Sequence, residues 1–211
     1  MTRRLAPAFA AAAAAALLAG ASPARPGSAP APEALEAQIL EVRALVREKR
    51  YPIALESLRL IARSIQELRL EEVRPAFPAA PPGWTAGELV SLAAEQEPWS
   101  RRIEARREYR RLDGTARISM TLDLHSPWIP TVSLSLNPLY VAGDGLARLV
   151  EVSGEKARLG FAPDSGDGDL RVILDGKVLV TLAGRGLASG ETLVDLARAI
   201  DFDLLRTRDG R

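Results

Sequence analysis

Apolar side chains recur with helical spacing from residue 33 onwards. Leu35, Ile39, Val42 and Val46 are separated by four, three and four residues, which places them on one stripe of a helix ending near residue 49. The Tyr51-Pro52 pair interrupts this helix, because proline disfavours a helical residue before it and suits the first turn of a new helix. A second apolar stripe follows at Ala54, Leu58, Ile61, Ile65 and Leu68. The pattern predicts an antiparallel helical hairpin over residues 33–74.

The joint of this hairpin, residues 47–58, is similar to the turn of a tetratricopeptide repeat, in which an aromatic residue precedes a small one. Arrays of such repeats need about three units to form a peptide-binding groove. The sequence offers one unit, so a packing hairpin is the favoured interpretation. We also expect that the hairpin can serve as a docking or dimerising surface.

A proline-rich connector over residues 75–83 ends the helices. Trp84 follows it directly, and a large aromatic side chain beside such a hinge is expected to fill the seam between two packed elements. Residues 86–95 carry a weak helical pattern, which predicts one further short helix.

Alternating polar and apolar residues then indicate β-strands. The apolar positions of residues 116–124 are every second residue, the period of a strand with one buried face. Asp113-Gly114 is a favoured tight turn, so residues 101–112 are expected to pair back on this strand. Four more strands are predicted at residues 147–152, 155–161, 169–174 and 177–183.

Two helices are predicted among the strands. Ser126-Pro127 and Asn137-Pro138 bracket a helix over residues 127–136, although Val132, Leu134 and Leu136 would also suit a strand. A helix over residues 191–200 follows Ser189, a candidate cap. The expected fold class is α+β: an N-terminal helical hairpin, then a largely antiparallel sheet of about six strands with two packed helices over residues 84–205. Residues 206–211 are expected to be a disordered tail.

The first residues have the features of a secretory signal. Arg3 and Arg4 precede an apolar run over residues 5–18, and small residues follow, so residues 1–24 are interpreted as a signal peptide cleaved after Ala21 or Ala24. Residues 25–32 are expected to form a disordered tether. We therefore expect a periplasmic or secreted protein. The apolar run is shorter than the roughly 20 residues of a transmembrane helix, so no transmembrane span is expected.

Composition narrows the classes of partner and chemistry. The chain of 211 residues has 28 basic and 27 acidic residues, and losing Arg3 and Arg4 with the signal changes the net charge from +1 to −1. Such a balance argues against a nucleic-acid-binding protein. Cysteine is absent, which excludes disulfides, thiolate catalysis and cysteine-bound metals.

Three motifs contain residue types that occur in catalytic, cofactor or metal sites, but none of them supports such a site. The glycine-rich residues 180–190 have the order strand, turn, helix, but the glycine spacing is wrong for dinucleotide binding and no second strand follows. Asp164, Asp167, Asp169 and Asp175 could hold Ca²⁺, but they lack the EF-hand order, and a solvated loop is favoured. His125 is the only histidine, so it cannot build a usual zinc site.

Six arginines crowd residues 101–111, at Arg101, Arg102, Arg106, Arg107, Arg110 and Arg111. On a strand, such a run most often protects an exposed sheet edge from pairing with another chain. The alternative is a contact surface for anionic headgroups or an acidic protein. That surface would comprise Arg102, Arg106 and Arg110, with Trp99 as an interfacial anchor.

Several short segments resemble an uncharacterised family of secreted bacterial proteins. These segments are Ala54–Leu58, Ser64–Gln66, Phe77–Ala86, the boundaries Ser126-Pro127 and Asn137-Pro138, and the ending Ala199–Phe202. The resemblance covers most of residues 35–205 and implies the helical hairpin, the connector ending in Gly-Trp-Thr, and a β-rich antiparallel domain. Residues 126–137 depart from the methionine-rich pattern of the relatives. The family carries no known activity.

Three functional hypotheses follow. The leading one is a soluble, non-enzymatic accessory protein of the periplasm that presents a surface to another envelope protein. The second is a carrier of a lipid or other apolar ligand, which would need an apolar cavity that side chains leave unfilled. The third is an enzyme whose site the sequence does not reveal.

Overall fold

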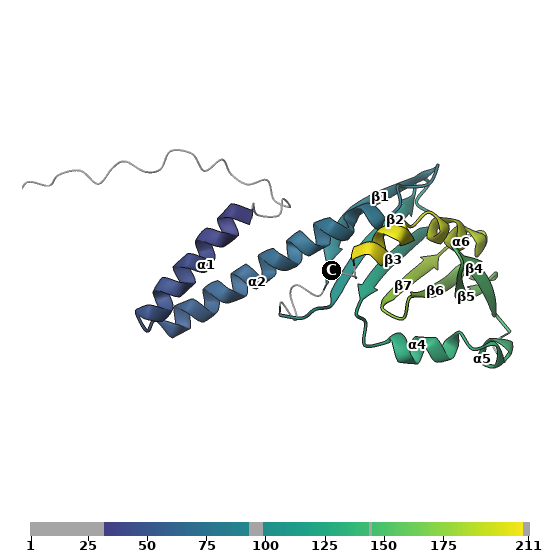
Figure 1. The fold of residues 1–211 in the computed structure, drawn as a ribbon. Coiled ribbons are helices and arrows are strands. Elements are labelled where there is room, and N and C mark those ends of the chain that lie inside the picture. Colours follow the sequence, from purple (N-terminus) through teal and green to yellow (C-terminus); the bar gives the residue numbers. More distant parts are fainter. Residues whose placement is uncertain (1–31, 93–98, 144, 209–211) are drawn as a thin grey trace, which may run out of the picture.

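Two long helices lead into a sheet in the computed structural model, which describes residues 32–92, 99–143 and 145–208 (Figure 1). Helix α1 spans Pro32–Arg47, helix α2 spans Tyr51–Val73, and a short 3₁₀ helix η1 spans Arg74–Ala76. The predicted signal peptide lies outside the described residues, as do the tether up to residue 31 and residues 93–98. None of the described helices is long and apolar enough to cross a membrane.

The helical hairpin is confirmed, but its buried seam is narrower than the predicted stripes. Leu35, Val42 and Leu45 of α1 pack against Ala54 and Ile61 of α2. A helix with a single partner buries only residues at coiled-coil spacing. The predicted stripe positions just beside this seam are therefore exposed: Ile39 by 51%, Val46 by 47% and Ile65 by 43%.

Seven strands form one sheet, and every neighbouring pair is antiparallel. The strands are β1 Trp84–Ser91, β2 Ile103–Arg111, β3 Arg117–Leu124, β4 Ala147–Val152, β5 Glu155–Ala162, β6 Asp167–Leu174 and β7 Val178–Arg185. Their order in space is β1-β2-β3-β7-β6-β5-β4. The fold class is therefore α+β, as the sequence predicted.

The strand missing from the sequence prediction is β1. Residues 86–92 were expected to be helical, whereas Trp84–Ser91 pairs with β2. Between Ala86 and Leu89 the register shifts, so that Gly87 and Glu88 together lie opposite Glu108 in a β-bulge. The extra residue breaks the alternation of polar and apolar positions that would have indicated a strand.

The chain crosses from β3 to β4 through two helices, α4 Ile129–Ser135 and α5 Pro138–Ala142. The predicted helix over residues 127–136 is confirmed, and its alternative as a strand is wrong. Asn137 also begins α5, because its side-chain oxygen accepts a hydrogen bond from the Leu139 backbone N–H at 3.0 Å. Figure 1 shows α4 and α5 on the other side of the strands from α6 Glu191–Arg198 and α7 Phe202–Arg208.

The C-terminal segment is ordered further than expected. Ser189 accepts a hydrogen bond from the Glu191 N–H at 3.1 Å, next to the start of α6. Residues 206–208 were assigned to a disordered tail, but they belong to α7. Arg206 holds this helix on the sheet through Glu155 at 2.9 Å and Asp175 at 3.5 Å. Residues 209–211 lie outside the described residues.

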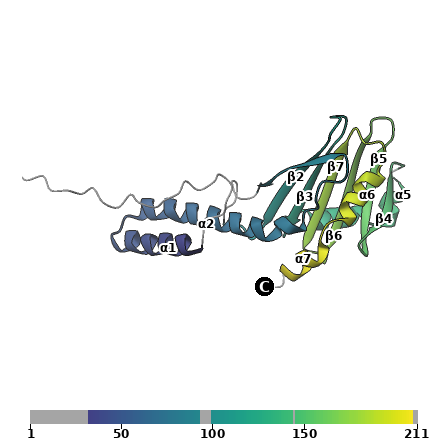
Figure 2. The same ribbon diagram turned by 90° about the horizontal axis from the view of Figure 1, so that it is seen from above.

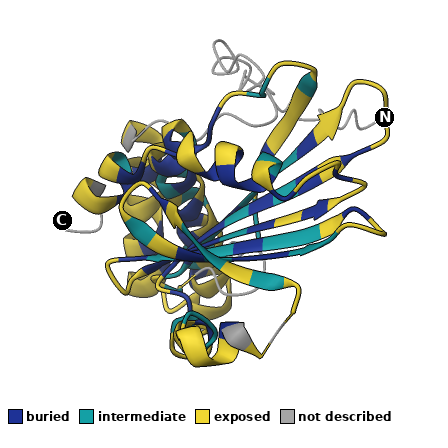
Figure 3. Cartoon of the chain, turned by 90° about the vertical axis from the view of Figure 1, so that its right-hand side faces the viewer, coloured by how far each residue is buried: buried dark blue, intermediate teal, exposed yellow. Residues whose placement is uncertain are grey.

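The main core lies between one face of the sheet and the helices α2, α6 and α7 (Figures 2 and 3). Leu70 and Val73 of α2 and Leu193 and Leu205 of the C-terminal helices pack into it. Trp84, predicted to fill a seam, packs against this core. Much of the opposite face near β1, β2 and β3 is polar, which leaves it available for contacts.

Candidate functional site

The arginine run lies on β2, which is an inner strand and not the edge of the sheet. The favoured interpretation, edge protection, is therefore wrong, because β1 covers β2 on that side. Successive residues of a strand point to opposite faces. Arg107 points to the core side, where its guanidinium carbon lies 5.4 Å from the centre of the Phe77 ring. Arg106 and Arg110 lie on the open face.

The four residues of the predicted anionic surface do not form one patch. Arg102 binds both carboxylate oxygens of Asp123, at 2.8 Å and 2.7 Å, and also pairs with Glu104 at 2.7 Å. The positive charge of Arg102 is therefore paired with Asp123, whose side chain is only 7% exposed. Trp99 is 62% exposed, but it precedes β2 and so lies at the far end of that strand from Arg110. Of the four, the structure brings together Arg106 and Arg110.

Two arginines that the sequence analysis did not select complete a row with Arg110. In the register of the sheet Arg110 pairs with Arg117 of β3, and Arg117 pairs with Arg185 of β7. All three side chains are exposed. Within the described part of the chain none of them has an ion pair. We call Arg110, Arg117 and Arg185 the arginine row.

Part of the arginine row can be predicted from the sequence. The Asp113-Gly114 turn was predicted, and a tight hairpin there sets Arg110 opposite Arg117. Arg185 could not be found in this way, because the pairing of β3 with β7 joins segments far apart in the sequence. Gly186 next to it has a φ of 65°, and a Cβ there would clash with the Thr115 carbonyl oxygen. The absence of a side chain at Gly186 allows its loop to pack closely against Thr115.

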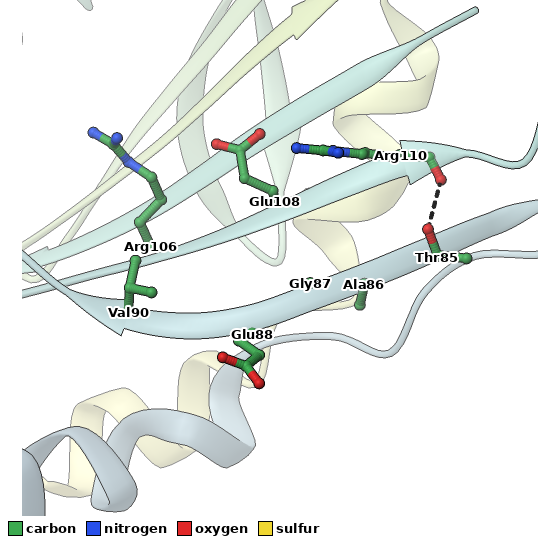
Figure 4. Close-up of a pocket in the computed structure, with 8 residues that line it drawn as sticks. All are labelled: Thr85, Ala86, Gly87, Glu88, Val90, Arg106, Glu108 and Arg110. Atoms are coloured by element: carbon green, nitrogen blue, oxygen red, sulfur yellow. Dashed lines mark hydrogen bonds between the residues drawn. The ribbon is translucent and has the colours of Figure 1, made fainter. Parts of the chain in front are cut away.

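A hollow of about 440 Å³ adjoins the row above β1 and β2 (Figure 4). It is lined by Thr85, Ala86, Gly87, Glu88, Val90, Arg106, Glu108 and Arg110. The β-bulge of β1 at Gly87 and Glu88 lies in its lining. Figure 4 shows the side chains of Arg106, Glu108 and Arg110 on the same side of β2.

Charges in this first hollow are incompletely satisfied. The Nε atom of Arg106 is buried and has no hydrogen-bond partner among the described residues. Neither Arg106 nor Arg110 is within ion-pair distance of a described acid. Glu108 is the only acid whose side chain Figure 4 shows between these two arginines. Arg106 and Arg110 are balanced in number by Glu88 and Glu108 in the lining, but the buried Nε of Arg106 still has no acceptor among the described residues, and an anion could supply one.

A second hollow of about 410 Å³ lies beyond the row, between β5, β6 and β7. Its lining includes Gly160, Gly168, Gly184 and Arg185. Asp169 in this hollow is paired with Arg158 at 3.1 Å and Arg171 at 3.2 Å. Its carboxylate is thus already neutralised by arginines.

The sequence candidates for metal binding do not converge. Asp167 and Asp169 lie at the second hollow, whereas Asp175 pairs with Arg206 at another edge. Among residues 32–92, 99–143 and 145–208, no three acidic or histidine side chains gather as a metal site would require. His125 is exposed at the end of β3, where its backbone N–H donates to the Lys177 carbonyl at 2.8 Å.

A second surface is apolar. We define the arm as α1 together with residues 51–61 of α2, the part of the hairpin that extends away from the sheet in Figure 1. Its exposed large apolar residues are Ile39, Leu40, Val46, Tyr51, Ile53, Leu55 and Leu60. Single exposed apolar residues are common, but seven on these two adjoining helices are more than scattered single residues explain, which makes the arm a candidate for protein contact.

Comparisons with protein-family models, with curated proteins and with solved structures found no match.

Proposed function

We propose that this chain is an accessory protein of the bacterial cell envelope that acts by binding another protein through its arm. The observation that carries the proposal is the apolar surface of the arm. Its location in the envelope rests on the signal-like pattern of residues 1–24. The partner is a protein with an apolar helical face, which would complete a bundle with α1 and α2.

The arrangement of the arm supports a helical partner. Ile39 and Val46 are seven residues apart and share one face of α1, while Tyr51 and Leu55 are four apart and share one face of α2. Among the described elements, each helix has mainly the other as its neighbour along the arm, so no described element covers these faces. Complete burial of a fully exposed large apolar side chain contributes about 1.5–3 kcal/mol of hydrophobic free energy, and these side chains, which are about half-exposed, can each contribute about half of that.

The carrier hypothesis gains no comparable support. A carrier needs apolar volume that its own side chains leave open. On the inner face of the sheet, Met120, Leu122 and Leu182 are fully buried in a continuous core with α6 and α7. The two hollows described above lie on the surface and carry charged linings. We therefore keep a single proposed function.

Photo-crosslinking in cells that produce the protein tests this proposal. A benzophenone side chain is placed at Val46 or Leu55 on the arm, and at Leu112 as the control. Leu112 is 72% exposed in the turn between β2 and β3, far from the arm. We expect both arm positions to give the same discrete crosslinked species, containing a second protein recovered from the periplasmic fraction.

Three outcomes would contradict the proposal. Equal crosslinking from Leu112 would show that the arm is not the contact surface. A product containing only two copies of this chain would replace an envelope partner with self-association. Recovery of the protein and its crosslinked partner from the cytoplasm would contradict the location.

A further inference from the structure

The arginine row places like charges directly opposite one another on adjacent strands. Such pairs destabilise a sheet, whereas opposite charges at the same positions stabilise it. Arg117 lies at the centre and has an arginine on each side. Adjacent strands are about 4.8 Å apart, so the row extends across about 10 Å of the sheet. Nothing in the described fold needs three unpaired cations there.

An unsatisfied donor lies beside the same row. The buried Nε of Arg106 is two residues before Glu108 and four before Arg110, on the same face of β2. A buried nitrogen without a partner costs free energy, so it calls for an explanation such as an ion that accepts its hydrogen bond. The row and this donor therefore each favour an anion on this face of the sheet, and Arg110 belongs to both the row and the first hollow.

We propose that the arginine row and Arg106 form a binding site for a ligand that carries phosphate groups. Guanidinium groups bind phosphate oxygens through paired, charge-assisted hydrogen bonds. A ligand with two linked phosphates would contact Arg117 together with one or both of its neighbours. The hollows at either end of the row would receive the rest of the ligand. This site is separate from the arm and does not depend on the proposed function.

The chemistry fits two sources, a soluble diphosphate and the phosphate headgroups of an anionic membrane. Inorganic pyrophosphate, titrated calorimetrically into the full chain at low ionic strength, represents the soluble source. Vesicles of phosphatidylglycerol, compared with vesicles of phosphatidylcholine in a sedimentation assay, represent the membrane source. Low ionic strength matters because salt screens exposed charges.

Arg117→Gln is the decisive variant, and Lys156→Gln is its matched control. Lys156 is an exposed cation of β5 on the same face of the sheet, outside the row and both hollows. We expect Arg117→Gln to weaken binding roughly tenfold or more, the loss typical of a charge-assisted hydrogen bond. Lys156→Gln should change it less than twofold. The Tm of Arg117→Gln should equal or exceed that of the native chain, which shows that it folds.

Pyrophosphate and the lipid vesicles distinguish a soluble phosphate ligand from a lipid headgroup. Binding of pyrophosphate that Arg117→Gln weakens supports a soluble ligand. Binding only to phosphatidylglycerol vesicles, with the same sensitivity to Arg117→Gln, supports a lipid headgroup. The proposal is overturned if neither probe binds, or if Lys156→Gln weakens binding as much as Arg117→Gln, because the attraction would then be unspecific.

Discussion

Tyr109 shows how a single polar group fixes the connector to the sheet. Its side chain is fully buried in the main core, and its hydroxyl donates a hydrogen bond to the Pro78 carbonyl oxygen at 2.9 Å. Pro78 lies in the proline-rich segment between η1 and β1. The bond therefore ties the segment that enters the sheet to the middle of β2.

We predict that Tyr109→Phe lowers the free energy of unfolding by about 1–3 kcal/mol, because it leaves a buried carbonyl oxygen without its donor. Urea unfolding followed by circular dichroism measures the change. Tyr140→Phe is the control, since Tyr140 is exposed on α5 and should leave stability unchanged. An equal effect of the two substitutions would show that the bond to Pro78 contributes nothing.

The same residue predicts a loss of stability at alkaline pH. Burial raises the pKa of Tyr109 above the ordinary value of a tyrosine, about 10, so the unfolded chain releases this proton at a lower pH than the folded chain. The contribution is complete below about pH 10 and is lost as pH rises through the folded pKa. Unfolding curves at increasing pH should therefore show a decline in the native chain that is smaller in Tyr109→Phe.

At the scale of elements, the sequence predicted regular structure well where one face is buried. The strands β3 to β7 and the helix α6 have clean periodicity, because each has one neighbour layer that removes its apolar side from water. The failures lie where this simple rule is broken. The bulge at Gly87 and Glu88 interrupts the alternation that would have indicated β1. The arm exposes stripe positions because α1 and the first part of α2 have no third neighbour among the described residues.

The candidate site was less predictable than the fold, for a physical reason. Arg106 and Arg110 could be placed on one face from strand alternation, and Arg117 follows from the predicted turn. Placing Arg185 in the row requires knowledge that β3 pairs with β7. Placing Arg102 in its ion pair requires knowledge that Asp123 is buried, which follows only from the complete sheet. A run of charged residues in a sequence therefore shows only that these residues are close along the chain. The order and register of the strands determine which charged side chains become neighbours.

The separation of the arm from the sheet leads to a prediction about elements. The buried residues of the arm seam form a cluster of their own, distinct from the main core, and α2 joins the main core only from Leu70 onwards. Gln66 and Arg69 also anchor α2, through hydrogen bonds to the Ser100 and Arg101 carbonyls at 2.7 Å and 2.6 Å. We predict that a chain beginning at Arg63 still unfolds cooperatively, which scanning calorimetry would measure. Loss of the cooperative transition would show that the arm is part of the folding unit.

At the scale of the whole molecule, two surfaces of different chemistry lie on different elements. The arm offers apolar side chains from α1 and α2, and the arginine row offers positive charge from β2, β3 and β7. Helix α1 contacts α2 and extends away from the sheet (Figure 1). Such an arrangement suits a protein that holds one partner by hydrophobic contact and a second, anionic ligand by charge.

If the surfaces act independently, variants should affect them separately. Replacing Ile39 and Tyr51 together by serine removes apolar area from the helix faces that carry Val46 and Leu55, so crosslinking from those probes should fall while pyrophosphate affinity stays within twofold. Arg117→Gln should do the opposite, because it removes charge from the row and leaves every arm residue in place. Crosslinking yield and calorimetric affinity for pyrophosphate, measured on all variants, test both expectations. Loss of both activities in a variant whose Tm is unchanged would contradict independence and would mean that one ligand bridges the arm and the row, or that the two surfaces are coupled.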